Sequence, residues 1–196
     1  TYIAWDVSNV TNMYRMFWYA GKNSKIFNIG SISNWNTSKV TNMERLFNYA
    51  GYSSSVFNLG DLSEKTVTLN GKTYTAWDMS SVQTTLGMFG TAGYSATTWY
   101  IGDLSNWDVS NVTTMGRDIT YTEDGTSFYG AYEGMFAFAG RNASDFDIGN
   151  LSNWNTSKVT NMNAMFYGCE NLKTLDLSNW DTSKVTTMEY MFTACY

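Results

Sequence analysis

The chain has 196 residues, of which 43% are hydrophobic and 15% charged, and its formal net charge is −5. This length and apolar content are enough to bury a core, while the acidic balance argues against a nucleic-acid partner or docking on an anionic membrane. The chain has no histidine, which excludes serine-histidine triads and imidazole zinc sites within it, and no apolar run approaches the ~20 residues that insert into a bilayer. We expect no cofactor and no metal.

The dominant feature is an internal repeat. A motif of the form Trp, Asp or Asn, any residue, Ser, any residue, Val begins six units, and most continue as Thr, Asn or Thr, Met, two variable residues, Met, Phe. The units start near Trp5, Trp35, Trp77, Trp107, Trp154 and Trp180. Successive Trp residues lie 30, 42, 30, 47 and 26 residues apart, so two units carry insertions. The pattern predicts one repeat domain over 1–196, in which equivalent side chains stack in columns.

The first half of each unit has the apolar spacing of a helix. A serine three residues after the Trp has the chemistry of a helix cap. In the first unit the apolar residues then recur at intervals of three or four, at Val10, Met13, Met16, Phe17 and Ala20. This spacing predicts a helix of two to three turns, too short to be stable unless it packs on its neighbours.

The second half of each unit alternates like a short strand. The last unit is preceded by Leu172, Leu175 and Leu177, and the longer units have segments such as 27–32, in which Gly30 indicates a bulge. One parallel strand and one short helix in every unit predict an α/β solenoid, a leucine-rich-repeat-like right-handed coil.

Two insertions interrupt the repeat. Residues 64–75 contain two β-rich segments around Asn70-Gly71, the preferred pair for a tight hairpin turn. Residues 116–134 contain two more such segments around Glu123-Asp124-Gly125. Each insertion predicts a β-hairpin.

Two cysteines, Cys169 and Cys195, lie 26 residues apart at the position that Ala20 and Ala50 occupy in earlier units. Stacked on adjacent coils they would be close. They form a disulfide in an oxidising compartment, or they pack as two small buried thiols; the sequence leaves both open.

Residues that break the repeat are the candidates for function, because the stacking of columns does not explain them. The second insertion is rich in aromatic residues, the strand positions add exposed polar ones, and further aromatics follow the predicted helices. The candidate ligand-binding residues are Tyr121, Phe128, Tyr129, Tyr132, Tyr100, Asp103, Asp61 and Asp147, and the further aromatics are Trp18, Tyr19, Tyr49, Phe138 and Tyr167. Tyr and Trp offer contact area with one polar tip. The alternative is that these aromatics pack over the edges of the fold.

The stretch from Trp154 to Phe192 resembles the 26-residue repeat of BspA-like leucine-rich-repeat proteins, a bacterial surface-protein family. The resemblance extends over nearly the whole chain outside the insertions. It implies a secreted or wall-attached protein, adhesion to other molecules and no enzymatic activity. Because neither end carries a capping unit, we expect further repeats or domains to flank this chain in a longer protein.

These observations predict a non-enzymatic interaction module of a surface or secreted protein. Its partner would be a protein or a glycan on a host or neighbouring cell. The alternative function is a structural spacer or stalk that has no ligand of its own.

Overall fold

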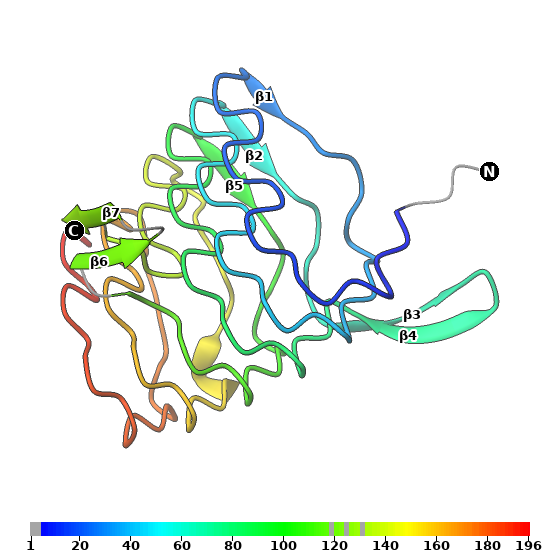
Figure 1. Cartoon of the computed structure of the whole chain (residues 1–196). Coiled ribbons are helices and arrows are strands. Elements are labelled where there is room, and N and C mark those ends of the chain that lie inside the picture. Colours follow the sequence, from blue (N-terminus) through cyan, green and yellow to red (C-terminus); the bar gives the residue numbers. More distant parts are fainter. Residues whose placement is uncertain (1–4, 118–119, 124–125, 130–131) are drawn as a thin grey trace.

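The computed structural model of the chain is a stack of coils (Figure 1). The structure describes residues 5–117, 120–123, 126–129 and 132–196, and for 120–123 and 126–129 it describes the backbone alone. One residue from each coil pairs with the next through an isolated parallel bridge, in the order Asn12, Asn42, Thr84, Thr114, Asn161 and Thr187. The six units of the sequence are therefore neighbours in space in the order in which they occur in the chain.

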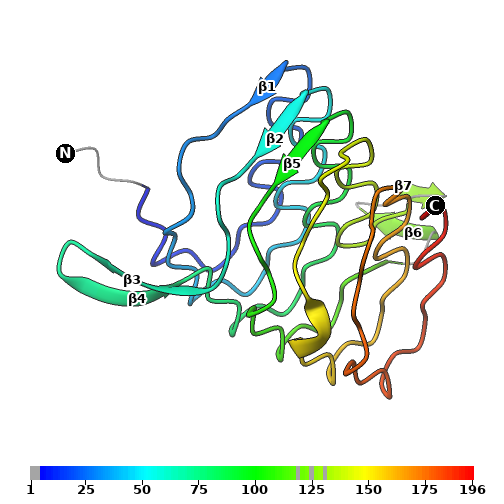
Figure 2. The same ribbon diagram turned by 180° about the vertical axis from the view of Figure 1, so that it is seen from behind.

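Regular strands occupy little of this stack. The strands β1 (Ile26–Phe27), β2 (Val56–Asn58) and β5 (Thr98–Tyr100) form a three-stranded parallel sheet in the order β1-β2-β5. Its register places Phe27 beside Phe57 and Phe57 beside Trp99. Figure 2, the view from behind, shows the three strands side by side along one side of the stack.

Both insertions form antiparallel hairpins, as their turn residues predict. The strands β3 (Lys65–Leu69) and β4 (Lys72–Ala76) pair across Asn70-Gly71, which has positive φ at both positions. The strands β6 (Thr120–Glu123) and β7 (Thr126–Tyr129) pair in the second insertion. Figure 1 shows the first hairpin projecting outward beyond the early coils and the second near the C-terminus.

The predicted α/β solenoid with a helix in every repeat is wrong. Among the described residues the one helical element is a single 3-10 turn, η1 (Leu151–Asn153), and no segment there is helical, long and apolar enough to cross a bilayer. The predicted strand in every unit is also wrong, because the parallel sheet spans only three coils.

Consecutive tight turns replace the predicted helix. In the first coil the N–H groups of Met16, Trp18 and Ala20 each donate to the carbonyl three residues back, at 3.0–3.2 Å. The N–H groups between them donate across to the next coil, as from Phe17 to Leu46 at 2.9 Å. A helix would keep both sets within one segment. Stacking diverts every second donor to a neighbour, and the chain follows the turns.

This path needs left-handed backbone at several turn residues. Arg15, Tyr19 and Gly21 have φ of 56°, 59° and 59°, and the second coil repeats the pattern. A non-glycine residue in this conformation costs about 1 kcal/mol. The hydrogen bonds between coils offset that cost, since otherwise the same N–H groups would lie unpaired beside a packed core.

Aromatic columns fill the core. The rings of Trp5, Trp35, Trp77, Trp107, Trp154 and Trp180 stack in chain order, with neighbouring centroids 6.1–6.3 Å apart. A parallel column of motif phenylalanines repeats every 5.4–5.7 Å. The indole N–H of each motif Trp from Trp77 onward donates to a carbonyl of the preceding coil, at 2.8–3.0 Å. The columns expected from the sequence are therefore present without the helices.

A buried ion cluster fastens the second insertion to the stack. Arg45 is only 1% exposed, and its guanidinium lies 2.5 Å from the carboxylate of Glu133, which follows β7. Arg117, which precedes β6, lies 2.7 Å from the carboxylate of Glu44. The third coil has Gly87 where the second has Arg45, and a Cβ there would lie 3.3 Å from the Arg45 side chain. Both arms of the insertion are thus held by charges of the second coil.

Candidate interaction surface

A continuous line of aromatic side chains runs along the stack at the turns. We call it the tyrosine stripe: Trp18, Tyr19, Tyr49, Tyr52, Tyr94, Phe138, Tyr167, Tyr132 and Tyr190. Neighbouring rings in this order lie 3.8–6.1 Å apart, centroid to centroid. The stripe therefore reaches from the first coil to the last.

The backbone of the turns places these rings. Tyr19, Tyr49 and Phe138 occupy the same position, two residues after the motif phenylalanine, and all have φ between 57° and 59°. That conformation turns their side chains away from the core column of motif phenylalanines. Because the coils stack in register, residues at one position of the turn lie above one another. A local backbone feature, repeated, thus makes a long surface line.

The stacked geometry decides which part of each ring a partner could reach. The ring planes of Tyr52 and Tyr94 differ by 12°, and those of Tyr132 and Tyr167 by 6°. Rings stacked this way cover each other's faces. These half-buried rings therefore offer a partner their edges more than their faces.

Three cations lie against the stripe, the first being Arg15, 4.4 Å from the ring centroid of Trp18. The ammonium of Lys22 is exposed and lies 4.5 Å from the centroid of Tyr19, within 6.0 Å of the rings of Tyr49 and Tyr52. Arg141 lies 5.4 Å from the ring of Tyr94, donates to its hydroxyl at 2.7 Å and pairs with Glu170. Such contacts orient the cations over the rings.

Burial favours the protonated form of two phenols of the stripe, Tyr49 and Tyr167. Desolvation, reinforced by the neighbouring Tyr19, raises the pKa of Tyr49. Desolvation and the adjacent Tyr132 likewise raise the pKa of Tyr167. The hydroxyls therefore remain hydrogen-bond donors across the neutral and mildly alkaline range.

The predicted site residues separate into different places. Tyr132 joins the stripe, together with the aromatics expected after the helices: Trp18, Tyr19, Tyr49, Phe138 and Tyr167. The side chains of Tyr121, Phe128 and Tyr129 lie outside the described part of the chain. Tyr100 is on β5, 48% exposed, and makes none of the ring contacts of the stripe.

The three predicted aspartates stabilise tight turns of the backbone. The carboxylates of Asp61, Asp103 and Asp147 each accept from the backbone N–H two residues later, at 2.9 Å. Burial opposes ionisation of Asp61, but hydrogen bonds from Lys65 and Ser63 lower its pKa overall. These hydrogen bonds explain why an aspartate occupies each position, so no bound ligand is needed to account for it. Among the described residues no group of three or more acidic or cysteine side chains could hold a metal ion.

Cys169 and Cys195 are free thiols in this structure. The Cys169 thiol donates to the carbonyl of Phe136 at 3.1 Å, and the Cys195 thiol to that of Phe166 at 3.0 Å. Burial raises the pKa of both, that of Cys169 strongly. This arrangement fits the second alternative, two small thiols packed within the stack.

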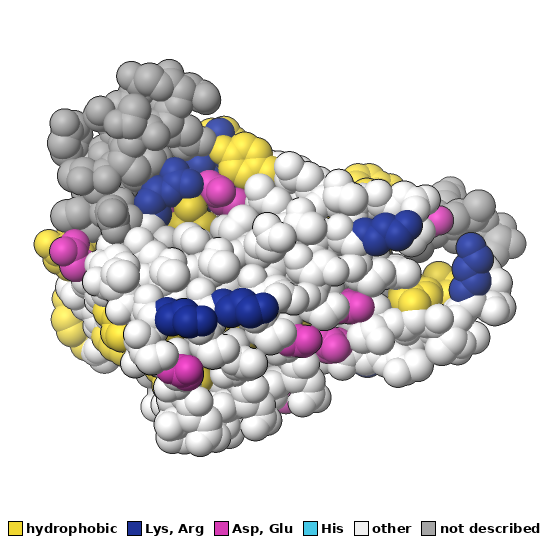
Figure 3. Space-filling view, turned by 60° about the horizontal axis from the view of Figure 1, so that its bottom comes forward, with side chains coloured by type: hydrophobic (Ala, Val, Ile, Leu, Met, Phe, Trp, Pro, Cys, Tyr) yellow, Lys and Arg dark blue, Asp and Glu magenta, His cyan; other side chains and the backbone are white. Residues whose placement is uncertain are grey.

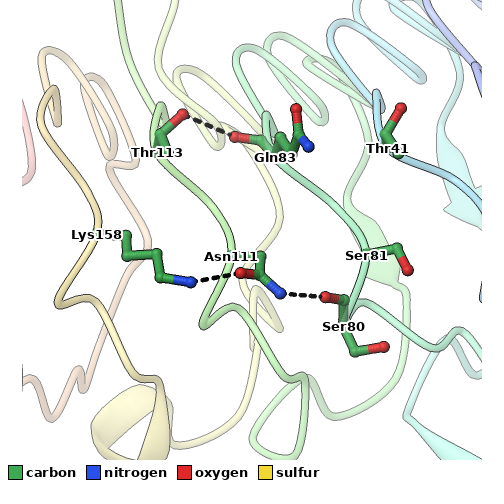
Figure 4. A pocket seen from close by; sticks show the side chains of 7 residues that line it. All are labelled: Thr41, Ser80, Ser81, Gln83, Asn111, Thr113 and Lys158. Carbon is green, nitrogen blue, oxygen red and sulfur yellow. Dashed lines mark hydrogen bonds between the residues drawn. The ribbon is translucent and has the colours of Figure 1, made fainter.

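A shallow polar groove of about 520 Å³ crosses four coils near Asn111 (Figure 4). Its side chains already pair with one another: Lys158 donates to the Asn111 amide oxygen at 2.5 Å, and the Asn111 amide donates to the Ser80 carbonyl at 2.7 Å. These hydrogen bonds between coils account for the polar side chains of the groove. The face drawn in Figure 3 shows charged side chains only in small separate groups among neutral ones and presents no basic stripe.

Sequence reasoning missed the continuity of the stripe. Tyr52 and Tyr94 were not among the candidates, although they join its two halves. Each follows a glycine that lies four residues after the motif phenylalanine, Gly51 and Gly93, so the shared position was a usable signal.

The family was decided by comparison with family models. The model described as "Mycoplasma protein of unknown function, DUF285" matches residues 2–58, 57–128 and 131–196, nearly the whole chain. The chain belongs to the DUF285 family. The proposed membership of the BspA-like leucine-rich-repeat family is wrong, and the helix-free coils agree with that correction. Searches of curated proteins and of solved structures found no match to this DUF285 chain.

Proposed function

We propose that this chain is a non-enzymatic interaction module that binds a partner protein through the tyrosine stripe. The single observation that carries the proposal is the unbroken line of nine aromatic side chains along the stack, with Trp18, Tyr19 and Tyr190 36–41% exposed. Packing of the core does not need these rings, since the Trp and Phe columns already fill it. Tyr and Trp are enriched where proteins contact each other.

The ring geometry favours a protein over a glycan. Sugars bind aromatic side chains by lying on an open ring face, and in the pairs Tyr52–Tyr94 and Tyr132–Tyr167 the facing ring faces are covered by the partner ring. Ring edges instead suit a polypeptide, which offers carbonyl oxygens and apolar side chains. Lys22, held over three rings, adds one positive charge for an acidic side chain of the partner.

The test is binding to printed arrays of extracellular-matrix proteins and of glycans. We expect the wild-type chain to bind protein spots and the double variant Tyr52→Ala/Tyr94→Ala to lose that binding. Tyr52→Phe/Tyr94→Phe separates hydroxyl from ring, and Tyr100→Ala is the matched control, an exposed tyrosine outside the stripe. Binding confined to glycans would contradict the choice of a protein, and binding to neither array would favour a structural spacer.

The proposal includes a location at the cell surface or outside the cell, where a matrix or host protein would be met. Protease treatment of intact cells that express the chain checks this part separately. Protection of the chain until the cells are broken would contradict it.

A further inference from the structure

Four successive coils place a cation, two tyrosines and a second cation at one position of the turn. Lys22, Tyr52, Tyr94 and Arg141 each follow the motif phenylalanine of their coil by five residues. The N–H after Tyr52 donates to the Lys22 carbonyl at 2.9 Å, and the N–H after Tyr94 donates to the Tyr52 carbonyl at 3.0 Å. The coils are therefore in register here, and the four residues form one column, which we call the cation–tyrosine column.

The two cations lie at opposite ends of the pair of rings. The Lys22 ammonium is 6.0 Å from the centroid of Tyr52, and the Arg141 guanidinium is 5.4 Å from the centroid of Tyr94. The two centroids are 4.9 Å apart, and both rings are half-buried. Contact with the rings holds each positive charge close to a fixed place along the column.

Both cations retain hydrogen-bond donors for a further partner. Lys22 is exposed, and within the described part of the chain its ammonium has no carboxylate in ion-pair distance. Arg141 donates to the Tyr94 hydroxyl and to Glu170, which uses two of the five N–H donors of a guanidinium. Carboxylates form the strongest hydrogen bonds with such cations. Since Glu170 already offsets part of the charge of Arg141, Lys22 is the stronger of the two positions.

The distance between the two cations selects the conformation of the partner. Three coil spacings separate Lys22 from Arg141, about 14 Å in total at the ~4.8 Å between paired parallel strands. Four residues of extended chain span about 13–14 Å and bring the first and fifth side chains to the same face. In an α-helix the same span takes about nine residues, and side chains that far apart point to opposite faces. An extended segment with two carboxylates four positions apart therefore fits.

Polar side chains flank the column, as the backbone of an extended segment requires. Asn23, Ser53, Ser95 and Asn142 come directly after the four column residues. Their side-chain amides and hydroxyls make no hydrogen bond with any described residue, and all but Ser95 are exposed. Such groups can pair with the N–H and carbonyl groups of an extended chain, which have no partners within their own segment.

We infer that the partner of the tyrosine stripe is an extended acidic segment with carboxylates at positions i and i+4, one on Lys22 and one on Arg141. An apolar side chain at position i+2 would lie against the edges of Tyr52 and Tyr94. The inference rests on the proposed function, since it names the partner of the same surface. The net charge of −5 of the whole chain opposes it little, because charges beyond about 8–10 Å are screened at physiological salt.

The test is calorimetric titration of the 196-residue chain with the peptide acetyl-Ser-Glu-Thr-Leu-Thr-Glu-Ser-amide. We expect this peptide to bind more tightly than acetyl-Ser-Glu-Glu-Leu-Thr-Thr-Ser-amide, which has the same composition with adjacent glutamates. Lys22→Met should weaken binding about threefold to fivefold, the value of one exposed ion pair. The control is Lys25→Met, which removes an exposed lysine outside the column and should leave the affinity unchanged.

A charge exchange tests the contact without removing a side chain. Lys22→Glu should bind acetyl-Ser-Lys-Thr-Leu-Thr-Glu-Ser-amide more tightly than it binds the peptide with two glutamates, and the wild-type chain should show the reverse preference. A merely structural role of Lys22 would not reverse the order of the two peptides.

Three results would overturn the inference. They are no binding of the peptide with two glutamates up to about 5 mM, weaker than millimolar affinity, equal binding of both glutamate spacings, and binding of a heparin oligosaccharide in place of the peptide. The proposed function fails separately, if Tyr52→Ala/Tyr94→Ala keeps its binding to protein arrays. Array binding that needs both tyrosines but is unchanged by Lys22→Met would retain the protein partner and exclude the acidic segment.

Discussion

The indole N–H of Trp107 donates to the backbone carbonyl of Leu62, 2.8 Å away in the preceding coil. The two residues are 45 positions apart in the chain, and both are at most 2% exposed. The same bond recurs from Trp77, Trp154 and Trp180. The Trp column is therefore a set of polar links between coils as well as an apolar stack.

We predict that Trp107→Phe lowers the free energy of unfolding by about 1–3 kcal/mol, since it leaves the Leu62 carbonyl buried without its donor and opens a small cavity. Urea unfolding measures the loss. Trp5→Phe, at a 64% exposed position, is the control and should cost less than about 0.5 kcal/mol. Equal losses at both positions would show that the link between coils contributes nothing.

Arg45→Met should destabilise the fold by about 3–5 kcal/mol, because it removes a buried cation and leaves the Glu44 and Glu133 carboxylates to share Arg117. Arg45 is 1% exposed and lies 2.5 Å from Glu133. The control is Lys65→Met, which breaks the half-exposed pair with Asp61 and should cost less than about 1 kcal/mol. Thermal unfolding compares the two variants, and a similar small effect for both would contradict the importance of the buried cluster.

Gly93→Ala should cost about 2–4 kcal/mol. Gly93 has φ of 57°, and a Cβ there would lie 2.6 Å from Phe57 and 2.8 Å from Trp99. Strain and overpacking therefore add. Gly71→Ala, with φ of 75° and nothing within 4 Å of its Cβ, carries the strain alone and should cost about 1 kcal/mol. Denaturant unfolding separates the two terms, and an equal cost would show that the contact with the Phe57 column is absent.

Glu64→Gln should stabilise the protein at pH 7 and not at pH 4. Burial raises the pKa of Glu64, and the nearby Asp78 and Asp108 carboxylates add to that shift despite a backbone hydrogen bond from Asp108. The folded state then binds a proton more tightly than the unfolded state, whose pKa is near 4.5. Stability is lost as pH rises through the folded pKa, so the ionised carboxylate destabilises the fold at neutral pH.

Melting curves at the two pH values check this prediction. The expected rise in Tm at pH 7 is about 1–2 °C. Asp176→Asn serves as the opposite control, because hydrogen bonds from Ser178 lower the pKa of Asp176 and its ionised form is favoured in the fold. A lower Tm for Glu64→Gln at pH 7 would mean that the hydrogen bond to Asp108 outweighs burial.

Much of the candidate surface could be located from the sequence, but its continuity could not. Tyr19, Tyr49 and Tyr167 stood out because they interrupt or follow the motif. The contact of Tyr132 with Tyr167 at 3.8 Å depends on how the second insertion leaves and rejoins the stack. Nothing in the local pattern specifies that path.

The sequence by itself determined which units are neighbours, which Trp, Val, Met and Phe side chains fill the core, and where the hairpins turn. Repetition makes those properties readable, because equivalent residues must share one environment. Only the tertiary structure decided the course of the backbone between the columns. Apolar residues spaced by three or four suit a helix and a run of tight turns equally. The choice depends on whether alternate N–H groups, such as that of Phe17, donate within the segment or to the next coil, and those partners exist only once the coils have stacked.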